Sequence, residues 1–386
     1  MASLVGVTST GLSAAAVVGP IGAAVEVWRV RRGLSQAELA GRSGLQLAAV
    51  QGLESGREWM DRRRVWAALA AALRVDPGEL AGQPYPPMGP EHAEVRAVAH
   101  RLRKALAAVP QRSTEPATAA VEELELLLAS AVTADRAGND HGLAVVAAEL
   151  ISTAERAVRV TTGATRQRAA DLRWHGHAVV AGLLRRLGYR DLAWLVLHRV
   201  RATGREPAGP LVAEEVRLLL DLGLPGQALG YVKRSGLVRH NVETSVLEAF
   251  AHAMAGRPEQ AGTELDAAAD LARDPGSRAA VTAARVAVAT EGADIDAANG
   301  YAALLDLSEL APADRVASMV SLAASAARAG DFARAAGHLL LAETTAPLRF
   351  RLDPFARELL VALPPRLADP DQAERVRAVA RRADLP

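Results

Sequence analysis

The feature that most limits how this chain can fold is a glycine followed five residues later by an alanine, which recurs five times. The successive alanines are 35, 33, 36 and 38 residues apart. Glycine suits a tight turn between two helices because it tolerates a positive φ, and alanine suits a close helix crossing. The period therefore predicts a stack of helix–turn–helix pairs. The five pairs of positions are Gly188/Ala193, Gly223/Ala228, Gly256/Ala261, Gly292/Ala297 and Gly330/Ala335.

Composition also favours helices. Half of the residues are apolar but only 3% are aromatic, and alanine and leucine, which both favour helix, dominate the apolar set. No segment alternates between apolar and polar residues over the length of a strand. We therefore expect an all-α chain with repeat units from about 165 to 345. Flanking helices are expected at about 118–136, 143–160, 354–363 and 371–383.

A larger side chain follows each of the five repeat alanines by four residues, and in two units another follows by seven, on the same helix face. In the fourth unit these are Tyr301 and Leu304, which we expect to point into the stack. Period and pattern resemble the tetratricopeptide repeat (TPR), in a degenerate form without its full aromatic signature. That resemblance implies a TPR-like α-solenoid, a right-handed superhelix with a concave groove.

The N-terminal region reads as five short helices over residues 21–82. Gly33 ends a first helix, and Ser35 with Glu38 forms a capping box that starts a second at Gln36. Gly44 breaks that helix, and a third follows from about residue 45 or 46. A fourth helix and a short last turn complete the region, the turn capped by Asp76 with a proline in its first position.

Four positions in this region have the spacing of a helix-turn-helix motif: Ala40, Gly44, Val50 and Leu53. The stretches VRRGLSQAELAGRSGL and LESGR closely resemble the Xre/Cro/phage-repressor family, over about residues 21–80. In that family an arginine of the first helix pairs with the glutamate that ends the recognition helix. The resemblance therefore implies a structural, partly buried ion pair between Arg29 and Glu54.

The same resemblance implies a surface for double-stranded DNA. Ser35 and Gln36 match the place where the family contacts phosphate, at a helix N-terminus. Beyond the recognition helix, Arg57 and Arg62, with Arg63 and Arg64, are expected to reach the DNA backbone without reading sequence. The base-contacting positions fall on Gln46, Leu47, Ala48, Ala49 and Gln51, and then Gly52.

The apolar start of this recognition helix leaves two hypotheses open. Glutamine can pair with adenine, and alanine or leucine can touch a thymine methyl, so recognition is expected to be sparse and to favour A·T pairs. A dimer would then read half-sites one helical turn apart, roughly 34–36 Å. In the alternative, the module is degenerate and the chain is a protein-interaction scaffold.

Breaks in composition set the expected domain limits. We expect a disordered extension over 1–20, the helix-turn-helix domain over 21–82, a linker with a bridging helix over 83–117 and the repeat domain over 118–386. The linker contains four prolines between residues 82 and 91. A basic helix at about 91–109 is expected to present a solvated face, or else to bridge the domains or touch phosphate.

The order of the two domains suggests a sensor. Residues 187–200 resemble the repeat domain that follows Xre-type modules in many actinobacterial regulators, and the architecture resembles peptide-sensing regulators of Gram-positive bacteria. The resemblance implies a homodimer with a peptide, a small molecule or a protein partner in the groove. The expected groove residues lie on the first helices of the repeats: Arg173, Arg217, Asn241, Glu248, His252 and Arg285.

Other chemistry is not indicated. The net charge of +1 does not indicate a particular class of binding partner. The absence of cysteine fits a reducing cytoplasm. His175 and His177 point to different helix faces, a poor metal pair, and Trp174 and Trp194 are expected in the core. No P-loop or catalytic motif is present, and glycines interrupt the uncharged N-terminal run, which lacks a basic n-region. We expect a cytoplasmic regulator, neither an enzyme nor a membrane protein, without cofactor or metal.

Overall fold

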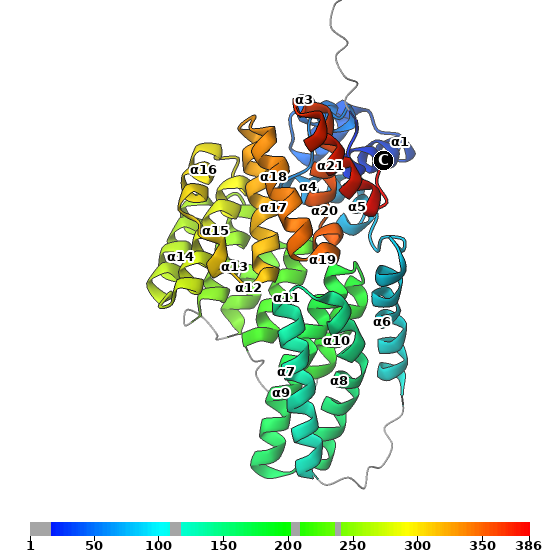
Figure 1. The fold of residues 1–386 in the computed structure, drawn as a ribbon, viewed down its shortest axis with the longest axis vertical. Helices are drawn as coiled ribbons and strands as arrows, with labels where there is room; N and C mark the ends of the chain where they lie inside the picture. The colour runs from blue at the N-terminus through cyan, green and yellow to red at the C-terminus, as the bar shows by residue number, and fades with distance from the viewer. Residues whose placement is uncertain (1–16, 109–116, 202–208, 236–240) are drawn as a thin grey trace, which may run out of the picture.

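The computed structural model describes residues 17–108, 117–201, 209–235 and 241–386, and this part of the chain is helical with no strand. The expected all-α class is confirmed. Five helices, the N-terminal module, come first and lie at one end of the elongated molecule (Figure 1). They are α1 (Pro20–Arg31), α2 (Gln36–Ser43), α3 (Leu47–Glu54), α4 (Arg63–Leu73) and α5 (Pro77–Ala81).

Local signals explain where these helices begin. The Ser35 hydroxyl accepts a hydrogen bond from the Glu38 backbone N–H, and the Glu38 carboxylate accepts one from the Ser35 backbone N–H, so the expected capping box is present. Gly44, at φ 68°, makes the turn between α2 and α3. Asp76 caps α5 through the Gly78 N–H.

The remaining helices form one array, α7–α21, to which α6 (Pro90–Ala107) adds on the side of α8. The apolar face of α6, with Val95, Val98 and Leu102, is buried in the same core as α7, α8 and α9. The array begins with α7 (Ala117–Arg136), α8 (Asp140–Val160), α9 (Gly163–Arg186), α10 (Arg190–Arg201), α11 (Gly209–Asp221), α12 (Pro225–Arg234), α13 (Val242–Met254) and α14 (Pro258–Leu271). It continues with α15 (Pro275–Glu291), α16 (Ile295–Leu304), α17 (Pro312–Arg328), α18 (Phe332–Thr345), α19 (Pro347–Leu352), α20 (Pro354–Ala362) and α21 (Pro370–Arg382).

The five expected turns each join two helices that pack on one another, from α9/α10 to α17/α18. The turn glycine has a positive φ in four of them, and the matching alanine is buried; these are Gly188/Ala193, Gly223/Ala228, Gly256/Ala261 and Gly330/Ala335. A sixth pair, α7/α8, has the same turn at Gly138. This turn lies outside the glycine–alanine pattern because Leu143 stands five residues after Gly138.

The fourth unit is shifted by one residue from the expected register. Gly292 has an ordinary φ of −75°, and Ala293 takes the left-handed conformation at φ 61°. Ala298, five residues after Ala293, is then the fully buried alanine. The expectation that Leu304 points into the stack is wrong, because its side chain is 76% exposed, and Tyr301 is only half-buried.

Exchanging the residues of this turn is expected to stabilise the protein. A left-handed alanine costs roughly 1–2 kcal/mol that glycine avoids. A Cβ at Gly292 would meet only ordinary contacts at 3.5 Å. The double variant Gly292→Ala/Ala293→Gly should therefore raise the free energy of unfolding by about 1 kcal/mol, measured by urea denaturation. Gly256→Ala, at φ 73°, is the reverse control and should lower the free energy of unfolding. An unchanged urea midpoint in both variants would contradict the assignment of the left-handed conformation to Ala293.

The array curves back on itself. Helix α17 packs on α7, and Leu348 and Leu352 of α19 belong to the core formed by α6–α9. Asp140 is fully buried at this closure and accepts hydrogen bonds from Arg186 (2.8 Å) and Arg349 (2.6 Å). Burial opposes its ionisation, but the two guanidinium groups hold the pKa of Asp140 below its ordinary value.

The N-terminal module shares a hydrophobic core with the end of the array. Ile21, Val25 and Trp66 lie in one contiguous cluster with side chains of α17, α18, α20 and α21. Trp66 meets Phe355 edge-to-face at 5.7 Å between ring centroids. Burial of this kind orders the module relative to the array, because separating the two would expose apolar surface to water.

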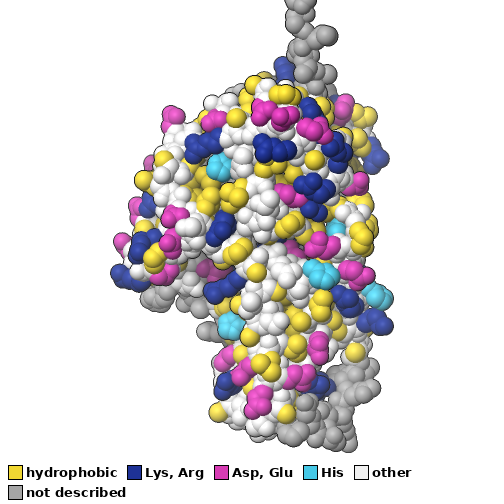
Figure 2. All heavy atoms as spheres, in the orientation of Figure 1, with side chains coloured by type: hydrophobic (Ala, Val, Ile, Leu, Met, Phe, Trp, Pro, Cys, Tyr) yellow, Lys and Arg dark blue, Asp and Glu magenta, His cyan; other side chains and the backbone are white. Residues whose placement is uncertain are grey.

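Two properties of the surface complete the description. Acidic and basic side chains are interspersed over the face that Figure 2 shows, in keeping with the small net charge. Among the described helices, none is long and apolar enough to cross a membrane.

Candidate nucleic-acid interface

The core of the N-terminal module fixes the angle between α2 and α3. Leu39 and Ala40 of α2 and Val50 and Leu53 of α3 are all buried. Gly52, on the same helix, is also buried, and a Cβ there would come within 2.6 Å of the Glu58 side chain. Gly52 therefore packs against the loop after α3. This differs from the prediction, which placed Gly52 among the base-contacting positions.

The expected ion pair between Arg29 and Glu54 is present. Arg29 Nε donates to Glu54 Oε1 at 2.6 Å and Nη2 donates to Oε2 at 2.8 Å, a bidentate pair. Their side chains are 13% and 4% exposed. The hydrogen bonds that Arg29 donates to Glu54 raise the pKa of Arg29 above its ordinary value. Because Arg29 Nη1 also donates to the Leu34 carbonyl, the pair ties α1 to α3 and to the start of α2.

The Glu54 carboxylate also positions the expected phosphate contact. Gln36 Nε2 donates to Glu54 Oε2 at 2.7 Å, which fixes the amide at the first turn of α2. An amide NH₂ group has a second hydrogen, which this bond does not use. Ser35 is exposed but its hydroxyl is engaged in the capping box. Of the two, Gln36 is the better placed to donate to a phosphate.

The expected base-reading side chains lie at the outer end of α3. Gln46, Leu47 and Ala48 are exposed, while Ala49 and Gln51 are half-buried. No side chain caps the N-terminus of α3, so its first backbone N–H groups point toward solvent beside the reading side chains. Helix α3 lies at the end of the molecule remote from α7–α9 (Figure 1).

The basic residues after α3 divide between solvent and the array. Arg57 is exposed and its Nε donates to the Ser55 hydroxyl. Arg62 is about one third exposed and lies 3.7 Å from Asp61. The expectation for Arg63 is wrong. Its guanidinium group lies 3.6 Å from Asp221 of α11 and over the rings of Phe250 and Phe355, because its helix begins against the array.

A buried glutamate of the array caps α4. Glu291, the last residue of α15, accepts hydrogen bonds from the backbone N–H groups of Arg63 (2.9 Å) and Arg64 (2.6 Å). These N–H groups belong to the first turn of α4 and have no partner within the helix. Glu291 thus occupies a helix N-terminus that would otherwise suit a phosphate.

A second buried glutamate caps α1. Glu358 of α20 accepts from the Ile21 backbone N–H at 2.5 Å and from the Met60 backbone N–H at 3.1 Å. Burial raises the pKa of Glu358 to about 7. Gly19, which precedes α1, is required by this contact, because a Cβ there would lie 2.3 Å from the Glu358 carboxylate.

Two arginines of the array hold the loop between α3 and α4. Arg328 of α17 binds the carboxylates of Glu58 and Asp61 and donates to the Trp59 carbonyl at 3.0 Å. Arg366 donates to the carbonyls of Gly56 (2.9 Å) and Arg57 (3.0 Å). The Trp59 ring contacts both guanidinium groups, at 4.5 and 5.3 Å from its centroid. The loop is therefore fixed to the array while α3 stays accessible.

These docking residues were not identified from the sequence. A signal was available, since Trp59 and Met60 follow the last core position of α3 and are too large and apolar for an exposed loop. They predict a partner surface, but nothing in their spacing identifies Arg328 or Glu358 as that partner.

The expected groove residues lie on α9, α11, α13 and α15, with Asn241 at the start of α13. Arg173 is wrong as a groove contact, because it is 6% exposed and lies 3.1 Å from Glu155 in an ion pair. Arg217 pairs with Glu214 and Glu243, and Asn241 caps α13. Arg285 binds Asp266. The assignment of Arg217, Asn241, Glu248, His252 and Arg285 to a ligand groove stays a prediction.

The histidines and tryptophans of α9 and α10 are placed as follows. His177 is fully buried, with Nδ1 2.8 Å from the Arg173 carbonyl and Nε2 3.4 Å from Glu155, and His175 is half-buried. Trp174 is buried, and Trp194 is partly buried against the core. Within the described ranges, no three acidic, histidine or cysteine side chains are arranged to hold a metal ion.

Comparison with known proteins identifies the N-terminal module. Residues 20–82 match the family model described as a helix-turn-helix domain. A search of curated proteins and a search of solved structures return no match. The chain thus carries a helix-turn-helix domain, which suggests a DNA-binding regulator, followed by a helical domain.

Proposed function

We propose that this chain is a cytoplasmic transcriptional regulator, without enzymatic activity, that reads double-stranded DNA with α3. One observation carries the proposal. The array fixes the module through α1, α4 and the intervening loop, yet leaves Gln46, Leu47 and Ala48 exposed at the end of the molecule. A rigidly held reading helix with an accessible first turn is the arrangement that DNA recognition needs.

Recognition on this surface would rest on few base contacts. Gln46 and Gln51 supply hydrogen bonds suited to adenine, and Leu47, Ala48 and Ala49 supply contacts suited to thymine methyl groups. The open N-terminus of α3, Gln36 and Arg57 supply phosphate contacts that set the register. Sequence-dependent DNA shape would add discrimination at positions that no side chain touches.

We further propose that the module is of the Xre type, that the array is TPR-like, and that the array mediates dimerisation and senses an effector. Two copies would place two α3 helices on half-sites about one helical turn apart, roughly 34–36 Å. Because the module is fixed to the array, any change in the geometry of two arrays would move both reading helices. An effector acts in this way only if it binds the two arrangements with different affinity.

The first test is an anisotropy titration of the full-length protein on its own upstream region and on scrambled DNA, at two salt concentrations. We expect a preference of about a hundredfold or more for the upstream region. Gln46→Ala should reduce that preference by roughly 1–3 kcal/mol, because a bidentate contact to adenine is lost. Arg57→Ala should weaken both DNAs about equally and reduce the salt slope by about one.

Exposed Arg375 of α21 provides the matched control, and Arg375→Ala should leave both affinities unchanged. Equal binding of all three variants to both DNAs would overturn the placement of α3 on DNA. In that case the alternative gains support: the exposed Leu47, at 42%, and its apolar neighbours would form a protein-docking face of an interaction scaffold.

A further inference from the structure

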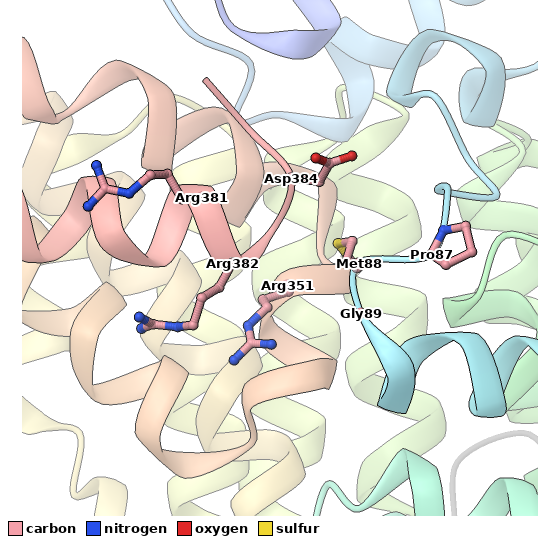
Figure 3. Close-up of a pocket in the computed structure, with 7 residues that line it drawn as sticks. All are labelled: Pro87, Met88, Gly89, Arg351, Arg381, Arg382 and Asp384. Carbon is pink, nitrogen blue, oxygen red and sulfur yellow. The ribbon is translucent and has the colours of Figure 1, made fainter.

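A cavity lies where the N-terminal module, the residues that follow it and the end of the array meet. Two hollows of about 400 and 270 Å³ both include Met88 and Asp384 in their walls, and we call them together the seam cavity. Figure 3 shows the first hollow, with Asp384 and Met88 close together and Arg351 and Arg382 alongside. The second is lined by Pro20 and Ala24 of α1, Leu80 of α5, and Tyr85 and Arg357.

Arg357, from α20, brings a buried positive charge to this cavity. Its side chain is 7% exposed, and among the described residues no carboxylate forms an ion pair with it. Nη1 donates to the carbonyls of Ala383 (2.8 Å) and Arg351 (3.4 Å). Nη1 also donates to Met88 Sδ at 3.2 Å, whereas Nη2 and Nε make no hydrogen bond within the described part of the chain, and Nε is inaccessible to water. A buried guanidinium group in this state is costly unless a partner binds it.

Tyr85 adds a second buried polar group without a partner. Its side chain is 3% exposed, and its hydroxyl makes no hydrogen bond to any described residue. The Arg357 guanidinium carbon lies 4.0 Å from the centroid of the Tyr85 ring, so the two groups stack. The large majority of buried side-chain polar groups in folded proteins are paired, so this hydroxyl is an exception.

The other charges of the cavity lie nearer to solvent. Asp384 and Glu79 are exposed, and so are Arg381 and Arg382. Glu343 binds both Arg351 and Arg382, and Glu374 binds Arg381. Arg357 is therefore the buried cation of the wall, and its Nη2 group makes no hydrogen bond within the described part of the chain. The rest of the second hollow is largely apolar, through Pro20, Ala24 and Leu80.

We propose that the seam cavity binds a small carboxylic acid with an apolar body, whose carboxylate accepts a hydrogen bond from Arg357 Nη2 beside the Tyr85 ring. A hydrogen bond from a guanidinium group to a carboxylate is charge-assisted and roughly twice as strong as one between neutral groups. The apolar body would lie against α1 and α5, so the ligand would contact the module and the array together. It would therefore favour the docked arrangement of the module, and the effect of this on DNA binding rests on the proposed function.

The test is calorimetric titration of the full-length protein with 3-phenylpropionate at millimolar concentration. We expect saturable binding, with a rise in the melting temperature. The neutral amide of the same acid should not bind, and inorganic phosphate, which lacks the apolar body, should bind at least tenfold more weakly. Tight binding of phosphate with no binding of the carboxylate would overturn the proposal in favour of a phosphate site.

Variants of the residues that line the cavity show whether the ligand binds there or elsewhere on the protein. Arg357→Met should weaken binding of 3-phenylpropionate by roughly tenfold or more, and Tyr85→Phe by a smaller factor. Asp384→Asn removes an exposed negative charge from the wall and should strengthen binding, which keeps the test decisive even if Arg357→Met fails to fold. Arg375→Met is the control and should bind like the wild type.

Absence of binding in the wild type, or unchanged affinity in all three cavity variants, would overturn the proposal. Its failure is distinguishable from failure of the proposed function. Calorimetry involves no DNA, so the two proposals are tested separately. Carboxylate binding without DNA binding would support the ligand site and contradict the proposed regulatory function. DNA binding without carboxylate binding would support the regulatory function and contradict the ligand site.

Discussion

Arg328→Met is expected to lower the free energy of unfolding by roughly 3–5 kcal/mol, the cost of removing one partner from a buried ion pair. Arg328 Nε lies 2.6 Å from Asp61 Oδ2 and Nη2 lies 3.1 Å from Oδ1, and the Asp61 side chain is 3% exposed. Without Arg328, the cation nearest to Asp61 in the described structure is Arg62, 3.7 Å away. Methionine retains the apolar part of the arginine side chain, so the loss of stability measures the contribution of the guanidinium charge.

The measurement is urea denaturation followed by circular dichroism and by tryptophan fluorescence. Trp59 contacts the Arg328 guanidinium and is buried, so release of the loop should shift its emission to the red before the array unfolds. The chain has five tryptophans, so the same measurement in a Trp59→Phe variant shows whether the change in emission comes from Trp59. Arg375→Met, on the exposed face of α21, should change stability by less than about 0.5 kcal/mol. Equal effects of the two substitutions would show that the loop is not held through Arg328.

The elements that the sequence predicted well are those set by local chemistry. The capping box of Ser35 and Glu38, the turn at Gly44 and the pair between Arg29 and Glu54 each depend on residues at most 25 positions apart. For the capping box and the turn, spacing along the chain determines the geometry, so the pattern alone was sufficient. The ion pair was instead implied by the resemblance to the Xre/Cro/phage-repressor family. The helix pairs of the array were predictable for the same reason as the turn at Gly44, since most of the turns are specified by their own glycine.

The one-residue shift in the fourth unit shows a limit of such patterns. Sequence analysis assigns the left-handed turn to Gly292, because only glycine adopts that conformation without strain. The structure assigns it to Ala293 and buries Ala298. The packing of α15 on α16 fixes the turn, and tertiary contacts of this kind override local preference.

The docking of the module depends on contacts that no periodicity predicts. Glu358 and Ile21 are 337 residues apart, and Arg328 and Asp61 are 267 apart. A single sequence contains no record of which distant glutamate caps which helix. The position of Arg63 was mispredicted for this reason: a run of arginines after a recognition helix indicates phosphate contacts, and only the folded array shows that one of them is paired with Asp221.

The second large effect concerns pH. Burial raises the pKa of Glu358 from 4.5 to about 7, although the hydrogen bonds from Ile21 and Met60 favour the carboxylate. Between these values the folded protein keeps a proton that the unfolded chain releases, so stability falls as pH rises. The contribution of Glu358 is complete below about pH 4.5 and is lost as pH passes about 7, with a total of roughly 3 kcal/mol. Burial raises the pKa of Glu291 as well, which adds a slope of the same sign.

Glu358→Gln isolates this contribution, because glutamine does not titrate. The amide can accept only one of the two backbone N–H bonds, so we expect a loss of about 1–3 kcal/mol that does not vary with pH. The fall in stability between about pH 4.5 and 7 should become smaller by roughly 3 kcal/mol, measured as urea midpoints across that range. Glu259→Gln, at an exposed position of α14, should give a curve parallel to the wild type. If the Glu358→Gln curve also ran parallel, the proton at the start of α1 would not be on Glu358. The pH dependence would then have to come from another buried carboxyl whose pKa is raised, such as Glu291 at the start of α4 or Asp353 at the start of α20.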